Sequence, residues 1–372
     1  MTNATNSKTS TAAVLVGPHK IECRSFPIPA IGEDEILVAV EGCGICGTDV
    51  HEYKRDPFGL IPVVLGHEGT GVIQALGSKV TVDTTGQPLA VGDQIVTSVL
   101  IPADCPITQD YPDRSNLSDS LGLYGLMPAS EQYHLNGFFA THIVIRAHST
   151  VFKVNGMNLK QRMLIEPMTV AVHALERAKT TNLLNFASVV LVQGCGPIGQ
   201  TVIAALHAYG IENIIAVDGE PSRLAMAKRM GAATTINFKE KDNAAKMAEI
   251  HAMTKGRGVD FAFQCTGVPA AAAGIWETIR RGGGLCELGF FVDSGEYSIN
   301  PHKVFCNKEI TVVGSWAYTA NEYPMAIAMI RHLDRIGIPM EDLVTHTFKL
   351  ADINQAMETC IAMTGLKIAV TP

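Results

Sequence analysis

The chain has 372 residues, of which 47% are hydrophobic and 17% charged, and its formal net charge is −7. This length favours two domains over one core, and the composition is that of a compact globular protein, not a disordered or fibrous one. No dense cluster of lysine and arginine is present, so nucleic acid is not an expected partner.

The nine cysteines are odd in number and scattered along the chain, which favours a reducing compartment over a disulfide framework. The N-terminal MTNATNSKTS is polar and lacks the apolar core of a signal peptide. No apolar run approaches the roughly 20 residues that cross a bilayer. We therefore expect a cytoplasmic protein with no membrane partner.

The first 145 residues or so predict a strand-rich region with few helices. Apolar runs such as EILVAVEG, VVLGHEGTGVIQALG and DQIVTSVLIP are separated by glycine and proline, as is typical of β-strands joined by turns. The stretch from residue 103 to about 136 has no clear pattern, and its length indicates a functional or interface loop.

From about residue 158 strands and helices alternate. We expect strands at 188–193, 213–218, 258–265, 284–291 and 309–316, with helices at 199–210, 222–231 and 270–279. This alternation predicts a doubly wound parallel sheet of about six strands with right-handed crossovers. After a helix at 323–336, the closing LKIAVTP is a strand that could return to the first domain's sheet. The expected domains are 1–157 with a return at 319–372, and 158–318.

A phosphate-binding turn is predicted at Gly194-Cys195-Gly196-Pro197-Ile198-Gly199, which follows a strand and opens a helix. There the backbone N–H groups and the helix dipole face an anion. Asp218 ends the next strand, where its carboxylate can accept the ribose hydroxyls of NAD and repel the 2′-phosphate of NADP. Arg223 could lie on the adenine or, if NADP is the cofactor, reach for that phosphate. Alternatively, the glycines serve only helix-to-sheet packing.

Four residues form a candidate metal set: Cys46, His67, Glu68 and Glu166. A thiolate, an imidazole and carboxylates gathered from distant segments suit a catalytic zinc with a position left for water or substrate. Each residue singly has a structural alternative, as a core cysteine or an ordinary surface or hydrogen-bonding group.

Local sequence refines this metal set. Gly66 before His67 and Pro167 after Glu166 indicate bends that point both ligands into a cleft. Cys43-x-x-Cys46 lacks the βαβ context of a redox motif and a second pair to complete a zinc knuckle. We therefore expect Cys43 to be a small buried residue.

Taken together, these segments resemble the zinc-dependent medium-chain dehydrogenase/reductase superfamily, in its alcohol and polyol dehydrogenase branches. The similarity covers the whole chain and is carried by GICGTDVH, GHEGTGVI, VGDQIV, the IEP before a helix, GCGPIGQ, Asp218 to Arg223 and THTFKL…LKIAV. It implies a GroES-like β-rich catalytic domain and a Rossmann domain. It also implies zinc and NAD as cofactors, a small secondary alcohol or polyol as substrate, and a homodimer or homotetramer.

The chain departs from familiar alcohol dehydrogenases in two features. The first is the catalytic zinc site, which in those enzymes is formed by two cysteines and a histidine. Glu166 stands in the place of the second cysteine, which resembles the sorbitol and threonine dehydrogenase branch. The sequence leaves open which of Glu68 and Glu166 binds the metal directly, and the two could exchange.

The second departure concerns the structural zinc of most members, because the 103–136 stretch offers only Cys105 where four close cysteines are usual. We therefore expect one zinc per chain. The acids of that stretch, with Tyr111, Tyr124 and Tyr133, could contribute to a subunit contact or shape the cleft.

The resemblance also implies a proton relay in which Thr48 takes the alcohol proton and His51 passes it to solvent by way of a cofactor hydroxyl. Without that relay, Thr48 would be a helix cap and His51 a solvent-facing side chain. Asp49 is expected to orient His67.

For the cofactor, the resemblance adds Thr266 and Lys367, with Lys367 reaching the pyrophosphate. Phe290, Phe291 and Trp316 could form walls of a dry cleft or serve as core or dimer contacts. Two alternatives remain: a zinc-free enone or quinone reductase of the same superfamily, and a non-catalytic nucleotide-binding protein of the same fold.

Overall fold

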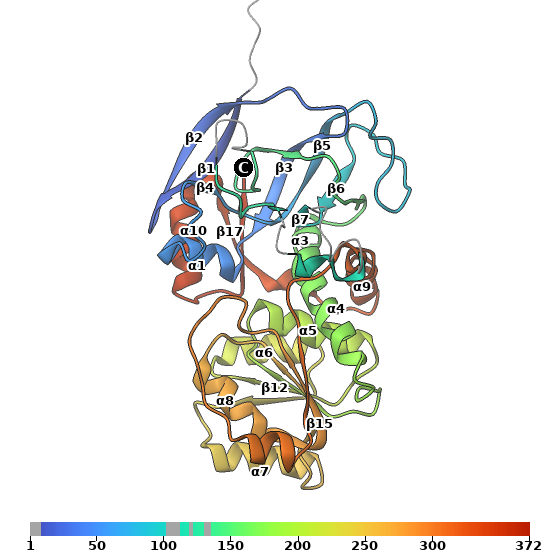
Figure 1. Cartoon of the computed structure of the whole chain (residues 1–372), viewed down its shortest axis with the longest axis vertical. Coiled ribbons are helices and arrows are strands. Elements are labelled where there is room, and N and C mark those ends of the chain that lie inside the picture. Colours follow the sequence, from blue (N-terminus) through green and yellow to red (C-terminus); the bar gives the residue numbers. More distant parts are fainter. Residues whose placement is uncertain (1–8, 102–111, 119–121, 130–134) are drawn as a thin grey trace, which may run out of the picture. The chain divides into compact units, whose positions relative to one another are not determined.

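The computed structural model describes residues 9–101, 112–118, 122–129 and 135–372, and it separates into two compact units (Figure 1). Unit 1 comprises residues 1–166, 319–324 and 344–372, and unit 2 comprises 167–318 and 325–343. The division falls at Glu166 instead of residue 157, and most of the helix expected at 323–336 belongs to unit 2 instead of the return. Cys105, Tyr111 and Tyr133 lie outside the described residues.

The main sheet of unit 1 is built around strand β3 (Ile36–Gly44). In the described ranges the strand order is β10-β6-β5-β3-β18-β17, with β9 also pairing with β3. These strands are β5 (Glu68–Leu76), β6 (Gln94–Thr97), β9 (His142–Ile145), β10 (Val151–Lys153), β17 (Val344–Lys349) and β18 (Lys367–Thr371). Strand β18 runs antiparallel to β3, with Ala369 opposite Gly44, which confirms the predicted return of the chain's end to this sheet.

Two smaller sheets complete unit 1. One has the order β2-β1-β4, from β1 (Thr9–Gly17), β2 (Lys20–Pro27) and β4 (Val63–Val64), and the other pairs β7 (Leu100–Ile101) with β8 (Gly122–Leu123). Three short helical turns belong to this unit as well: η1 (Pro112–Leu117), η3 (Ala320–Glu322) and η5 (Leu350–Asp352).

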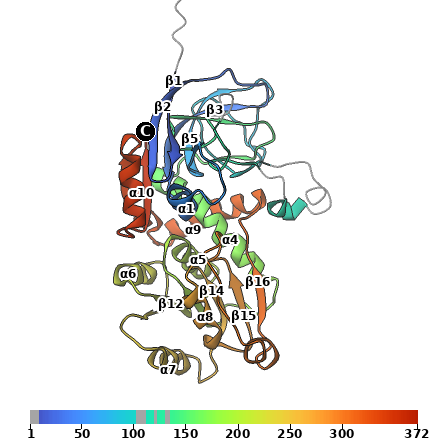
Figure 2. The same ribbon diagram turned by 60° about the vertical axis from the view of Figure 1, so that its left-hand side comes forward.

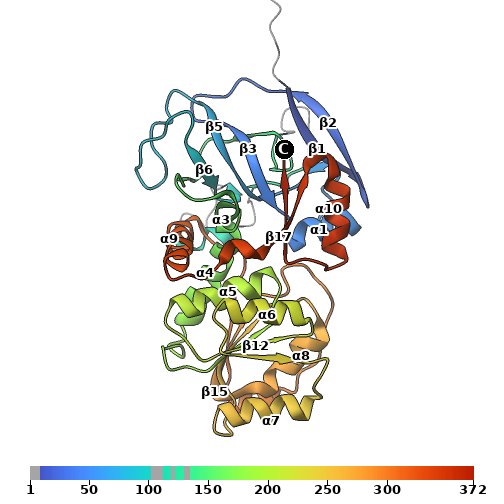
Figure 3. The same cartoon turned by 180° about the vertical axis from the view of Figure 1, so that it is seen from behind.

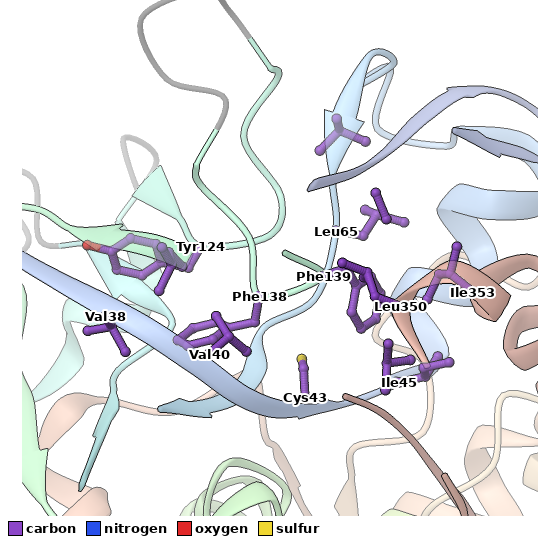
Figure 4. Packing of buried hydrophobic residues seen from close by; sticks show 14 of the residues in the cluster. Val38, Val40, Cys43, Ile45, Leu65, Tyr124, Phe138, Phe139, Leu350 and Ile353 are labelled. Carbon is purple, nitrogen blue, oxygen red and sulfur yellow. The ribbon is translucent and has the colours of Figure 1, made fainter. Parts of the chain in front are cut away.

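The hydrophobic core of unit 1 lies against β3 and joins segments from both ends of the chain (Figure 4). Val38 and Val40 of β3, Phe139 and the C-terminal Ile353 are all buried. Each fully buried aliphatic or aromatic side chain of this kind stabilises the fold by roughly 1.5–3 kcal/mol. This core fixes the end of β3, where the candidate site begins.

Helix α1 (Gly47–Arg55) directly follows β3 and was not predicted as an element of the strand-rich region. Asp49 in its first turn accepts the backbone N–H of Cys46 at 2.8 Å, a capping interaction that satisfies one of the donors at the start of the helix. The helix ends at Arg55, and the C-cap residue that follows, Asp56, has a left-handed φ of 49°. Helices α1 and α10 (Ile353–Ile361) lie side by side (Figures 2 and 3).

Unit 2 is built on a six-stranded parallel sheet whose order within the described residues is β13-β12-β11-β14-β15-β16. The strands are β11 (Val190–Gln193), β12 (Ile214–Asp218), β13 (Thr234–Asn237), β14 (Val259–Gln264), β15 (Ile279–Glu287) and β16 (Thr311–Gly314). This 3-2-1-4-5-6 order is that of the doubly wound nucleotide-binding fold, which confirms the predicted fold class. Strand β13 was not among the strands predicted individually, because TTIN is short and polar.

Helices α5 (Pro197–Ala208) and α6 (Pro221–Arg229) cover one face of this sheet, and α7 (Asn243–Met253) and α8 (Pro269–Thr278) cover the other (Figures 1 and 3). Helices α5, α6 and α8 begin with proline at the first helical position, where its fixed φ suits a helix start and its missing N–H costs nothing.

The remaining helices are α3 (Leu159–Met163), α4 (Ile165–Lys179), α9 (Tyr323–Arg335), the π-helical η2 (His302–Cys306) and η4 (Met340–Leu343). Across the ranges that the structure describes, no helix has the length and apolarity to cross a membrane.

Candidate functional site

Three of the four predicted metal ligands come together in unit 1. The candidate ligand atoms of Cys46, His67 and Glu68 all lie within 4.8 Å of one another. Cys46 precedes α1, and Glu68 begins β5, where it pairs with Gly44 at the end of β3. Strand pairing therefore brings the two ligand segments together. His67 and Glu68 are 6% and 1% exposed, so the cluster combines a thiol, an imidazole and a carboxylate in a largely buried place.

Glu68 carries an unsatisfied oxygen that fits a metal ligand. Its Oε1 accepts a hydrogen bond from Lys367 Nζ at 2.5 Å, whereas its Oε2 is buried with no hydrogen-bond partner among the described residues. An orphaned buried carboxylate oxygen is costly. A cation shared with Cys46 and His67 would satisfy it, and this donor set suits zinc.

Glu166 is placed differently from the prediction. It lies in the first turn of helix α4, so the bend expected from Pro167 is wrong. Proline within the first turn of a helix needs no bend, because the N–H groups there have no intrahelical acceptor. Among the described residues the ligand cluster contains Glu68 and not Glu166.

Asp49 links the two segments that carry the candidate ligands. Besides the N–H of Cys46, its carboxylate accepts the N–H of Gly66 at 3.1 Å, and its Oδ1 lies 3.5 Å from Nδ1 of His67. Nδ1 of His67 has no hydrogen-bond partner among the described residues, so the orienting role of Asp49 stays a prediction.

The same groups make the cluster attractive to positive charge. Burial acts to lower the pKa of His67, but the Asp49 carboxylate and the Cys46 thiol group outweigh it and raise that pKa well above its usual range. A field that stabilises an imidazolium also favours a metal cation at the same place.

Lys367 belongs to this cluster and does not reach out toward a nucleotide as we expected. It is 2% exposed, and its Nζ donates to Ile45 O at 3.1 Å as well as to Glu68. Burial opposes its charge, but Glu68 and Cys46 raise the pKa of Lys367 above its usual value. Its ammonium is therefore a fixed positive charge behind Glu68.

The two residues of the predicted relay lie three positions apart on α1, which places them on the same side of the helix. Thr48 is 5% exposed, and its Oγ1 lies 3.8 Å from Cys46 Sγ. His51 is half-buried, and Nη2 of Arg55 lies 3.3 Å from its Nδ1. Burial, followed by the charges of Arg55 and Lys54, lowers the pKa of His51, so its imidazole is neutral at neutral pH.

Cys43 has no part in this cluster. It is fully buried within the unit 1 core (Figure 4), its thiol donates to Gly44 O at 3.2 Å, and burial raises its pKa well above the usual value. A thiol that stays protonated is a poor nucleophile and metal ligand. The prediction of a small buried residue is confirmed.

In unit 2 the predicted phosphate-binding turn joins β11 to α5. Gly194 has a φ of +90°, which favours glycine. A Cβ on Gly199 would come within 1.8 Å of Gly194 O, and a Cβ on Gly194 would meet Thr266 at 3.1 Å. The turn is therefore tight, and Thr266 lies beside it.

Asp218 ends β12 next to the turn and is held by three backbone donors. Its carboxylate accepts the N–H groups of Cys195, Gly219 and Glu220 at 2.7, 2.7 and 2.9 Å. Since a carboxylate offers about four acceptor positions, one remains on Oδ2 for a ribose hydroxyl. Arg223 lies in α6, where its backbone N–H donates a hydrogen bond to the backbone oxygen of Glu220 at 3.0 Å.

The aromatic residues proposed as cleft walls separate into two contacts within unit 2. Phe291 stacks on Trp316 with ring centroids 4.3 Å apart, and Phe290 faces Tyr297 at 6.2 Å. Tyr124 is fully buried in unit 1, with its hydroxyl 2.7 Å from Ser149 Oγ. It is therefore a residue of the unit 1 core.

Sequence reasoning missed two residues that shape the metal cluster. One is Lys367 as the partner of Glu68, and the other is Gly44, where a Cβ would lie 2.1 Å from Glu68 Oε2. The only sequence signal was glycine at the end of an apolar strand, which does not say which side chain needs the space.

Comparison with known proteins now decides the family. Residues 32–156 match the model described as "Alcohol dehydrogenase GroES-like domain", and residues 197–332 match "Zinc-binding dehydrogenase". The chain belongs to the zinc-dependent medium-chain dehydrogenase family. Two curated members of this family are sorbitol dehydrogenase from Bacillus subtilis, 33% identical over 97% of both chains, and D-xylulose reductase A from Aspergillus oryzae, 31% identical over 95% of this chain and 94% of the other.

Solved structures of this family have the same fold. The alcohol dehydrogenase from Thermotoga maritima superposes with a TM-score of 0.91 at 27% identity, covering 98% of this chain and all of the other. The predicted fold and family are confirmed.

Proposed function

We propose that this protein is a zinc- and NAD-dependent dehydrogenase that oxidises a secondary alcohol or polyol to the ketone. The observation that carries the proposal is the buried Cys46–His67–Glu68 cluster with its orphaned carboxylate oxygen. The phosphate-binding turn and Asp218 support NAD, and the names of the curated relatives, a sorbitol dehydrogenase and a D-xylulose reductase, support a polyol.

In this proposal Cys46, His67 and Glu68 hold one zinc ion, and Glu166 is the carboxylate that can take Glu68's place. Bound zinc would supply a Lewis acid that makes the substrate hydroxyl more acidic, while NAD would supply the hydride acceptor. Asp49 keeps His67 oriented, and the Lys367 ammonium holds the Glu68 carboxylate in place through Oε1.

The chain's own residues then move the substrate proton. The Thr48 hydroxyl, beside Cys46, accepts the proton at Oγ1 while passing its own toward His51, by way of a hydroxyl that bound NAD would supply. His51, with its lowered pKa, is neutral and so can accept a proton and release it to solvent. Phe291 and Trp316 are proposed to exclude water from the nicotinamide.

The test is formation of NADH from a panel of polyols, vicinal diols and secondary alcohols, with NADP measured in parallel. We expect turnover with NAD on at least one polyol, and no turnover by Cys46→Ala on that substrate. Failure of every alcohol, combined with reduction of an enone or quinone, would favour the zinc-free reductase instead. Nucleotide binding without any turnover would favour the non-catalytic alternative.

We also propose a homodimer or homotetramer in the cytoplasm. Strand β16 ends the parallel sheet with Thr311, Val312 and Gly314 exposed, and an uncovered sheet edge can pair with a second copy. Sedimentation of the protein at several concentrations would measure the assembly, and a monomer throughout would contradict the proposal.

A further inference from the structure

Beyond Asp218, two charged side chains face each other across neighbouring loops of unit 2. Glu220, in the loop after β12, forms an ion pair with Lys239, in the loop after β13. The loops are in close contact, since a Cβ on Gly219 would lie 2.7 Å from the Phe238 ring and 2.9 Å from Lys239 Cε.

The backbones on both sides of this pair are anchored to the ends of the two strands. The N–H of Glu220 bonds to Asp218 Oδ1 at 2.9 Å, and the N–H of Lys239 bonds to Asn237 Oδ1 at 3.0 Å. The two side chains are 47% and 58% exposed, and an ion pair this exposed contributes little to stability. The pair therefore affects the charge beside Asp218 more than it affects the stability of the fold.

That position matters if the dinucleotide binds as proposed above, on which this inference rests. In the doubly wound fold the adenosine ribose lies at the end of the second strand, and an NADP 2′-phosphate is bound by cations beside the residue that would otherwise hold the ribose. Lys239 supplies such a cation, and lysine ammonium groups bind phosphate well when no other anion holds them. In this chain Glu220 already holds it.

We propose that Glu220 determines the preference for NAD over NADP by occupying the Lys239 ammonium. A 2′-phosphate has to displace the Glu220 carboxylate before it can reach Lys239, and it does so next to a second acid, Asp218. Asp218 therefore binds the ribose, while Glu220 keeps the nearby cation unavailable to the phosphate.

The pair's chemistry supports this role. Lys239 lowers the pKa of Glu220, through its hydrogen bond first and its charge second, and Arg223 lowers it further. Glu220 consequently stays ionised over the whole physiological range. Replacing it with the neutral isostere glutamine keeps the side chain's shape and releases Lys239.

The experiment measures two ratios in wild type and in Glu220→Gln. The first is kcat/KM for NADP divided by kcat/KM for NAD, and the second is the binding affinity for NADPH divided by that for NADH, from fluorescence titration. We expect both ratios to shift toward the phosphorylated cofactor by about tenfold, the value of one charge-assisted hydrogen bond. Adding Lys239→Gln to Glu220→Gln should return the ratios to within about twofold of wild type. The gain should also shrink as salt is raised.

A matched control is Asp342→Asn, which breaks the Arg229–Asp342 ion pair at the other end of α6 and should leave the ratios at the wild-type value. An unchanged ratio in Glu220→Gln would overturn the proposal. So would a gain that survives the added Lys239→Gln, because the lysine would then not be the phosphate ligand. If wild type binds NADH but oxidises no alcohol, the proposed activity fails, and the binding ratio still decides this inference.

Discussion

Cys43 and Cys46 are three positions apart and have opposite surroundings. The first points into the unit 1 core, and the second begins the metal cluster. We therefore predict that Cys46→Ala loses both bound zinc and dehydrogenase activity, whereas Cys43→Ala keeps both. The core change should lower the free energy of unfolding by about 1 kcal/mol, because it leaves a small cavity. Metal analysis and urea unfolding would check this, and zinc loss in Cys43→Ala would contradict it.

His51 gives a prediction about pH. Its neutral form accepts the proton, so alcohol oxidation should rise as the pH increases through the pKa of His51, which burial, Arg55 and Lys54 hold below 6.5. Arg55→Met removes one of these charges and should move the acidic limb of the kcat/KM profile to higher pH. Glu358→Gln, a charge change on helix α10, is the control. An acidic limb that does not move in Arg55→Met would show that His51 does not control it.

At the scale of elements, helix α1 carries Thr48, Asp49, His51 and a buried carboxyl group that the mechanism does not use. Glu52 is fully buried, and its Oε2 has no hydrogen-bond partner among the described residues. Burial, together with the neighbouring Asp56 and Asp49 carboxylates, raises the pKa of Glu52 from 4.5 to about 7. The folded state therefore binds this proton more tightly than the unfolded state does.

The pH dependence of stability follows from that difference. As pH rises from 4.5 to about 7, the unfolded chain has already lost the Glu52 proton and the folded chain must give it up, so the free energy of unfolding falls. Glu52→Gln should remove this decline, making the variant more stable than wild type by roughly 1–3 kcal/mol near pH 8. Denaturant unfolding at several pH values and fixed zinc content measures it, and parallel curves for both proteins would contradict it.

The turn between β11 and α5 makes a separate prediction. Gly199→Ala places a methyl group 1.8 Å from Gly194 O, so the turn must open. We expect at least tenfold weaker NADH binding, a cost above about 1.4 kcal/mol, with zinc content unchanged. Gly17→Ala in β1, where a Cβ meets nothing within 4 Å, is the control. Fluorescence titration that finds wild-type affinity in Gly199→Ala would contradict this role for the turn.

Much of the fold could be predicted at this scale, because periodicity and local turn chemistry are properties of neighbouring residues. The strands and helices of unit 2 follow from apolar runs bounded by glycine and proline, and the glycine turn follows from its position between a strand and a helix. Helix α1 was missed because nine residues with a polar, glycine-led start resemble a loop. The bend at Glu166 was wrong because Pro167 fits the first turn of α4.

At the scale of the whole molecule, the candidate site could be predicted only in part. The residue types of the metal set indicated zinc, but the pairing of Lys367 with Glu68 joins positions 299 residues apart. Such a contact depends on β18 returning to β3, and no local pattern states which side chains then meet. The same holds for Gly44, whose missing side chain makes room for Glu68.

The two units divide the proposed chemistry between them, with the metal cluster in unit 1 and the phosphate-binding turn in unit 2. The central claim is that Cys46, His67 and Glu68 hold a catalytic zinc ion. The most direct measurement is NADH formation from a polyol substrate during removal and stepwise return of zinc, with bound metal counted at each step. The account predicts activity that disappears on chelation and returns in proportion to zinc, reaching its maximum near one ion per chain. Activity that survives complete zinc removal would contradict it.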